Sequence, residues 1–159
     1  MSVFVARVRR IHPGWILAVL DVFGLIVAGY LSTVELGGGV PYCGPLHGCE
    51  TVALSQYARI GGIPVAVFGV ILSLILLTLA IAWIRTDRPE LLDVHYGLSL
   101  IGVIFEIYFL SVQLFILHAV CIWCTLYGVS LILRFLVALV IWVRQGRFQA
   151  HFGRGAAED

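Results

Sequence analysis

The sequence has no lysine and little charge of either sign. Its 159 residues include ten arginines and nine acidic residues, so charged side chains make up only 12% of the chain, whereas hydrophobic side chains make up 61%. A soluble domain of this size usually has about a quarter of its residues charged. The net charge of +1, with no lysine-rich patch, gives no reason to expect a nucleic-acid partner. The high share of hydrophobic residues and the low share of charged residues predict an integral membrane protein with little mass outside the lipid.

Long polar stretches are also scarce, because most of the chain falls into apolar runs that can cross a bilayer, which takes roughly 20 residues per helix. We expect four spans, at 15 to about 32–35, 64–83, 92–118 and 120–142. The first run is long enough to be a permanent span rather than a cleaved signal. The predicted fold is an all-α, integral membrane four-helix bundle over residues 15–143, with a cytoplasmic segment at 1–14 and a cytoplasmic tail at 144–159.

The one long polar segment is the loop at 36–61, between the first two spans. It opens on three glycines and holds Cys43 and Cys49, and residues 50–58 are expected to form a short interfacial helix. Gly61, Gly62 and Pro64 end the loop, since proline is tolerated in the first turn of a helix. The last two spans are joined almost directly near residue 118, which predicts an antiparallel hairpin.

The arginines outside the spans predict the orientation. With four spans, Arg59 lies on one side of the membrane and the other eight lie together on the opposite side. These eight are Arg7, Arg9, Arg10, Arg85, Arg88, Arg144, Arg147 and Arg154. Cytoplasmic segments carry the excess of arginine, so both termini are expected in the cytoplasm of a multi-pass cell membrane protein. The loop and the 118–121 turn then lie outside, where disulfides persist.

Two pairs of cysteines lie near this outer face. Cys121 and Cys124 form a CxxC pair at a helix start, where the helix dipole favours a reactive thiolate. Cys124 lies about 4–5 Å deeper than Cys121, toward a lipid-soluble partner. Cys43 and Cys49 are six residues apart in a flexible loop, which allows them to pair or one to swing away. We expect thiol–disulfide exchange between the loop pair and the helix pair to carry two electrons inward, which makes the four cysteines an electron relay.

Other uses of the cysteines are weaker. They can act as small buried hydrophobes or as structural disulfides. A zinc site is disfavoured because a thiolate pair at membrane depth is a poor metal platform, so no metal is predicted. A c-type haem requires histidine after Cys124, and Thr125 stands there instead.

The combined pattern resembles the vitamin K epoxide reductase family, and most of all its bacterial members. It consists of Cys43 and Cys49, then Ser55 and Tyr57, then Gly62-Ile63-Pro64 opening a span, and Cys121-Ile122-Trp123-Cys124-Thr125 in the last span. The resemblance implies a helical bundle around a quinone of the ubiquinone, menaquinone or phylloquinone type. It implies that Cys124 is the thiol that reacts with the quinone and that Cys121 is its resolving partner. Cys49 would pass electrons to Cys121, and Cys43 would be the first contact for a thioredoxin-like protein. Ser55 would lie near the quinone head group.

Two departures from the family concern the quinone. Animal members have an asparagine early in the second span, and the stretch 64–66 has none. They also have a tyrosine four residues after the last cysteine, where this chain has Gly128, with Tyr127 one residue earlier. Both favour plain quinone reduction over reduction of vitamin K epoxide. Many bacterial relatives carry a fused thioredoxin-like domain, and because this chain is too short for one, we expect a separate redox partner and the membrane quinone pool.

Three charged residues lie deep inside the predicted spans, at a similar depth of roughly 18–21 Å from the outer turn: Asp21, Glu106 and Arg134. We expect a cluster in which Arg134 pairs with one or both carboxylates and locks helix packing. A proton route to the quinone is the functional alternative.

Further polar and aromatic side chains are candidates for the quinone pocket. Gln113 lies roughly 7–8 Å below the turn and is a hydrogen-bond candidate in place of the missing asparagine, or else it joins two helices. Tyr57 and Tyr127 are candidate pocket residues. His118 is a candidate to stabilise a thiolate or to protonate a quinol, and His47 to change the pKa of the loop cysteines. Lesser candidates are Tyr108, Ser111, Trp123, Phe105 and Phe115.

These features together predict a membrane thiol:quinone oxidoreductase that makes disulfides outside the cytoplasm. One alternative is a vitamin K quinone or epoxide reductase proper. Another is the unrelated four-helix disulfide-forming oxidases, which place their CxxC in the first outer loop rather than in the fourth span. The alternative of another class is a non-catalytic membrane protein that binds a metal or a lipid.

Overall fold

Four long helices form the body of the protein. The computed structural model describes residues 12–44 and 48–145, and in them the long helices are α2 (Gly14–Leu36), α4 (Val65–Thr86), α5 (Pro89–Ser111) and α6 (Ile122–Arg144). Each is long and apolar enough to cross a membrane, α5 together with the turn that continues it to Ile116. The predicted all-α membrane bundle is confirmed. Most of the two terminal segments, and His47, lie outside the described residues.

Local sequence explains where the helices begin and end. Pro64 directly precedes α4 and Pro89 is the first residue of α5, positions where the missing N–H of proline costs nothing. Between them Asp87 adopts a left-handed conformation (φ 51°), and its N–H caps α4 by bonding to the carbonyl of Trp83. The short charged connection predicted around residues 85–90 is therefore a tight helix–helix turn.

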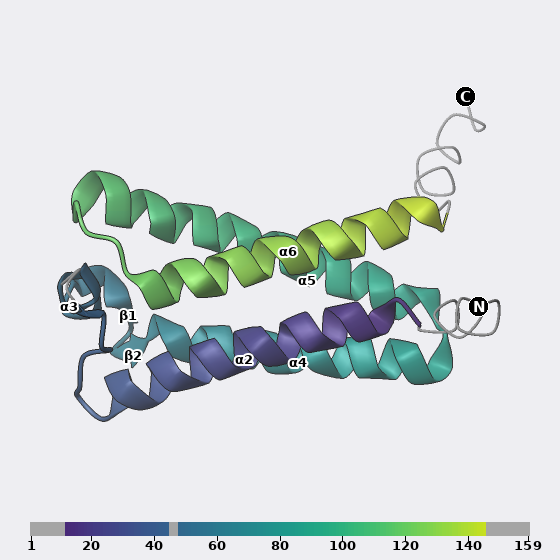
Figure 1. Ribbon diagram of the computed structural model, residues 1–159, viewed down its shortest axis with the longest axis horizontal. Helices are drawn as coiled ribbons and strands as arrows, with labels where there is room; N and C mark the ends of the chain where they lie inside the picture. Colours follow the sequence, from purple (N-terminus) through teal and green to yellow (C-terminus); the bar gives the residue numbers. More distant parts are fainter. Residues whose placement is uncertain (1–11, 45–47, 146–159) are drawn as a thin grey trace, which may run out of the picture.

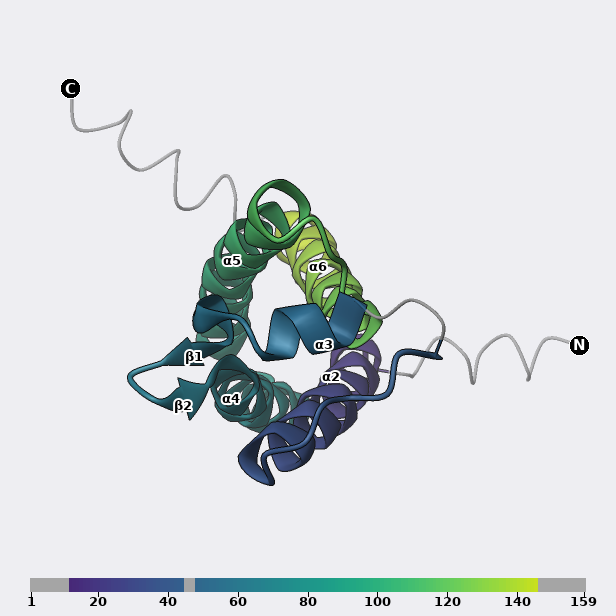
Figure 2. The same cartoon turned by 90° about the vertical axis from the view of Figure 1, so that its left-hand side faces the viewer.

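The helices lie side by side along the bundle (Figure 1) and form a ring, seen end-on in Figure 2, in which α2 packs on α4, α4 on α5, α5 on α6 and α6 on α2. The outward faces carry exposed aliphatic side chains such as Val19, Ile26, Ile104 and Ile107, as expected of a surface solvated by lipid. At the end where α4 and α5 join, a closely packed apolar cluster fills the interior; it comprises Leu17, Ala18, Ala80, Trp83, Leu92 and Ala138.

The other end of the ring is covered by the segment between α2 and α4. The helix α3 (Gly48–Ala53) lies across the opening (Figure 2), followed by the 3-10 turn η2 (Gln56–Ala58) and a hairpin of β1 (Arg59–Ile60) and β2 (Ile63–Pro64). The single helix expected at 50–58 is interrupted because Ser55 is extended (ψ 155°) and bonds the carbonyl of Val52. The hairpin was not predicted; Gly61 and Gly62 supply its turn with positive φ angles.

The connection between α5 and α6 is longer than the sequence indicates. Helix α5 continues into a π-helical turn, η3 (Val112–Ile116), and α6 starts only at Ile122. His118, expected at the end of a span, has a left-handed backbone (φ 48°) in the extended segment between them. This segment crosses the covered end of the ring and brings Cys121 over α3.

Candidate active site

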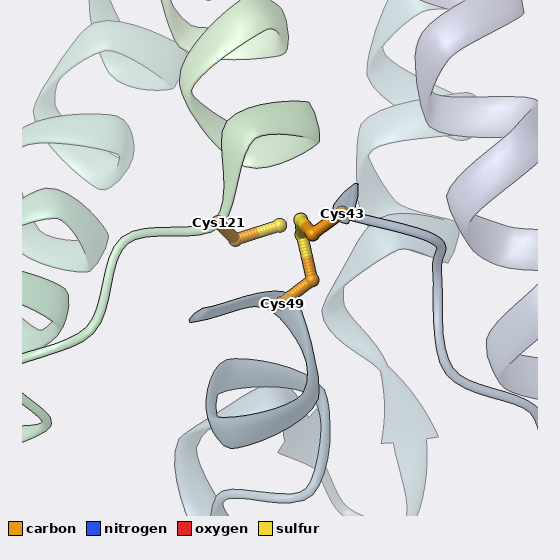
Figure 3. A group of neighbouring side chains, drawn as sticks. All are labelled: Cys43, Cys49 and Cys121. Carbon is orange, nitrogen blue, oxygen red and sulfur yellow. A yellow bond between two sulfur atoms is a disulfide. The ribbon is translucent and has the colours of Figure 1, made fainter. Parts of the chain in front are cut away.

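Three cysteine sulfur atoms meet where α3 faces the start of α6. Cys43 and Cys49 form a disulfide with a Cα–Cα distance of 5.8 Å, whereas Cys121 and Cys124 are free thiols. The Cys121 Sγ points at the disulfide, and the three sulfur atoms lie within 4.8 Å of one another (Figure 3). Two of the three are bonded to each other rather than present as the thiolates that metals bind. The arrangement is that of a thiol placed beside a disulfide for exchange.

Cys121 is held by both neighbouring helices. Its backbone N–H donates to Gln113 Oε1 (2.8 Å), and its Sγ accepts the N–H of Cys124 (3.4 Å), so that it caps α6. The Cys124 thiol, and then the N–H groups of Cys124 and Trp123, lower the pKa of Cys121 against the opposing effect of burial. These contacts favour the thiolate form of Cys121. Cys124 follows one helical turn further into the bundle.

A tyrosine–tryptophan clamp fastens the disulfide loop to the CxxC helix. The indole Nε1 of Trp123 donates to the carbonyl of Tyr42 (2.9 Å), the residue before Cys43. The Tyr42 N–H donates to the Tyr30 hydroxyl (3.4 Å), and the rings of Tyr30 and Trp123 are 4.6 Å apart. Trp123, a candidate for stacking on a quinone ring, thus holds the loop.

On the other side of the disulfide, Gly48 contacts the backbone of Val120, and a Cβ atom at residue 48 would overlap with the Val120 carbonyl.

We expect Gly48→Ala to push α3 away from Cys121 and to slow electron transfer from the loop by about tenfold or more. The reason is that moving reacting groups apart by about 1 Å can lower a reaction rate by up to about 100-fold. The measurement is the rate at which a reduced Cys43–Cys49 pair reduces the Cys121–Cys124 disulfide. Gly29→Ala is the matched control, because nothing lies within 4 Å of its added Cβ; equal rates in the two variants would contradict this role.

A cavity of about 370 Å³ lies between the four long helices, below β1. Its wall is almost wholly apolar and includes Phe68, Phe105 and Phe109; its polar side chains are Glu106 and Tyr127. The Tyr127 hydroxyl donates to the carbonyl of Gly69 (3.1 Å). Cavities that take ring-shaped organic ligands are of this size and character.

The other predicted quinone contacts line a smaller cavity of about 50 Å³ under α3, namely Ser55, Tyr57 and Gln113, together with Glu35. Val65, Ala66 and Phe109 line both cavities, so the two are neighbours. The structure thus places the four predicted quinone contacts in adjoining spaces, with Tyr127 in the larger. The Gln113 carbonyl oxygen is already engaged by Cys121, which the sequence did not indicate.

Other candidates lie apart from both cavities. Phe115 and Tyr108 are exposed, and the hydroxyl of Ser111 bonds to its own helix. His118 lines an open hollow beside Gly48 and Thr125, on the outside of the cysteine cluster.

The predicted charge cluster exists, with one carboxylate rather than two. Arg134 and Asp21 are fully buried and paired (3.4 Å), and Arg134 also donates to Ser73 and Ser130. The partner that the sequence reading missed is His95, whose Nε2 lies 3.2 Å from Asp21. The available signal was a histidine inside a predicted span. Arg134 also lies 5.4 Å from the Tyr127 ring, so the cluster supports the floor of the larger cavity.

A model of a known protein family matches most of the chain. The family model described as vitamin K epoxide reductase family matches residues 15–139, which covers all four long helices except the ends of α2 and α6 and includes all four cysteines. No curated protein matches the sequence.

Proposed function

The chain belongs to the vitamin K epoxide reductase family, and from this we propose that it is a thiol:quinone oxidoreductase that forms disulfides in a separate thioredoxin-like partner outside the cytoplasm. The family and the four apolar helices make it a multi-pass membrane oxidoreductase with quinone-linked chemistry. The proposal adds the direction of electron flow, the partner and the roles of the cysteines.

The single observation that carries the proposal is the Cys121 thiol beside the Cys43–Cys49 disulfide, with Cys124 one turn further into the bundle. In the first step a reduced partner dithiol exchanges with the loop disulfide, which leaves the partner oxidised and Cys43 and Cys49 as thiols. Two electrons and two protons have then passed from the partner to the loop pair.

In the second step the Cys49 thiolate attacks Cys121 of an oxidised CxxC pair and releases Cys124. Cys43 then attacks Cys49, re-forms the loop disulfide and releases Cys121. A leaving thiol of low pKa departs faster, and the pKa of Cys121 is lowered. The structure has the loop pair oxidised and the helix pair reduced, the redox state that follows this step.

In the third step the Cys121–Cys124 dithiol reduces a quinone, the two-electron acceptor. The larger cavity fits a quinone head group because its wall is apolar and its volume is suitable. Tyr127 and the phenylalanine rings would hold the ring there, and Ser55, Tyr57 and Gln113 remain predicted contacts from the adjoining cavity.

The charge distribution supports an outer location for the cysteines. Arg85 in the last turn of α4, Arg88 just before α5 and Arg144 at the end of α6 are exposed. These helix ends lie at the opposite end of the bundle from α3 and β1, the strand that contains Arg59 (Figure 1). With these helix ends cytoplasmic, both termini are cytoplasmic and the cysteines face the oxidising side.

The test uses the full chain purified in detergent, with dithiothreitol as electron donor and a soluble ubiquinone or menaquinone analogue. We expect dithiothreitol oxidation that depends on quinone, with one quinol formed per disulfide. Comparing quinone with vitamin K epoxide separates plain quinone reduction from the epoxide-reductase alternative. Bound metal by elemental analysis, without quinone-dependent thiol oxidation, would overturn the proposal in favour of a binding protein.

A further inference from the structure

The larger cavity has only two polar side chains in its wall, and one is already committed. The single O–H of Tyr127 donates to the carbonyl of Gly69, and its oxygen lies 3.4 Å from the Ser73 hydroxyl. The Glu106 carboxyl, in contrast, makes no hydrogen bond or ion pair with any residue in the described part of the chain. Arg134, the cation at similar depth, is paired with Asp21 instead. An unpartnered polar group facing an apolar cavity is free to bind a ligand.

Glycine at residue 128 makes the room for this carboxyl. A Cβ atom at Gly128 would overlap with the Glu106 carboxyl group, so the side chain of α5 lies directly against the backbone of α6 there. Gly128 is four residues after Cys124, on the same face of α6 and about 6 Å further along the helix. The free carboxyl therefore lies one turn below the thiol that is proposed to reduce the quinone, on the wall of the cavity proposed to hold it.

A carboxyl group in this position has the right chemistry for a quinone oxygen. In its acid form it donates an O–H to the carbonyl, and as a carboxylate it accepts from the hydroxyl of the quinol. Both roles use the same oxygen atom and require no movement of the helix. A side chain amide in its place donates a hydrogen bond but transfers no proton.

We infer, resting on the proposed function, that Glu106 is a catalytic residue whose carboxyl group binds one quinone oxygen and delivers a proton to it. Oxidation of Cys121 and Cys124 to a disulfide releases two electrons and two protons. Both electrons enter the quinone, and Glu106 gives its proton to one quinone oxygen. One thiol proton restores the Glu106 acid and the other reaches the second oxygen, so that quinone and dithiol become quinol and disulfide.

The test is the steady-state kinetics of Glu106→Gln with dithiothreitol and the same quinone analogue. We expect kcat to fall by about 100-fold, the usual contribution of a positioned acid. KM should change by less than about threefold, because the amide still donates a hydrogen bond. The limb of the kcat–pH profile that depends on a protonated carboxyl should disappear. Glu106→Leu should raise KM as well as lower kcat.

Glu90→Gln is the matched control, since it makes the same change at an exposed position in the first turn of the same helix. Thermal unfolding of the three variants checks that the fold is retained. Wild-type kcat and pH profile in Glu106→Gln, or equal loss in Glu90→Gln, would overturn this inference and leave the proposed function standing. Failure of the wild type to reduce any quinone would overturn both.

Discussion

Replacing Cys124 with alanine is expected to abolish quinone reduction, with a loss of more than about 1000-fold for every thiol donor. In the proposed mechanism all electrons reach the quinone through the Cys124 thiol. Removing this nucleophile therefore stops the reaction even when the other cysteines are intact. The loss should be the same with dithiothreitol and with a protein dithiol, because both donors feed the same final thiol. The measurement is quinol formation by absorbance on the purified variants.

The loop cysteines provide the contrast. Cys43→Ala and Cys49→Ala should block oxidation of a protein dithiol yet leave reduction by dithiothreitol within about threefold of the wild type, because a small thiol reaches Cys121 without the loop. In Cys43→Ala the Cys49–Cys121 mixed disulfide should accumulate, since the thiol that resolves it is absent; mass spectrometry of the alkylated protein detects it. Substantial quinone reduction by Cys124→Ala would refute the relay.

Replacing Asp21 with alanine is expected to destabilise the fold by about 3–5 kcal/mol. Asp21 and Arg134 are both fully buried, and the carboxylate bonds Arg134 on one oxygen and His95 on the other. Removing the carboxylate leaves the guanidinium charge without its counter-ion in the interior of a membrane protein. The measurement is the unfolding transition in detergent, followed by helical circular dichroism.

The double variant Asp21→Ala with Arg134→Met is the informative control. Removing both charges eliminates the unpaired cation, and exchange of a buried pair for apolar side chains is often neutral. We therefore expect the double variant to recover most of the stability lost in Asp21→Ala, a non-additivity typical of residues in contact. Simple addition of the two single losses would show that the pair does not interact in the membrane.

The sequence predicts the spans well because their signals are local. Pro64 and Pro89 mark helix starts, apolar length sets the span, and the short connections force neighbouring helices to be antiparallel. The pairing of Asp21 with Arg134 was also within reach, because helix rise gives the depth of each residue. The cysteine pattern predicts which side chains meet, and the structure brings the Cys121 thiol to the loop pair.

What the sequence does not give is rotation about each helix axis. Glu106 has the depth of Asp21 and Arg134, yet it faces the cavity and Gly128 rather than the cation. Gln113 is in a π-helical turn, which changes the direction of its side chain and lets its amide oxygen reach the N–H of Cys121. Such differences come from tertiary packing, which a periodic pattern of apolar residues does not specify.

The sulfur atom that caps α6 is also the atom that we propose exchanges disulfides. In the structure Cys121 Sγ accepts the N–H of Cys124, as an N-cap side chain does at the start of a helix. A thiolate is a stronger acceptor than a sulfur in a disulfide, so each oxidation of Cys121 weakens the cap. We therefore expect the first turn of α6 to exchange its amide protons faster when Cys121 is oxidised, so that amide hydrogen exchange at Trp123 and Cys124 reports the redox state of the pair.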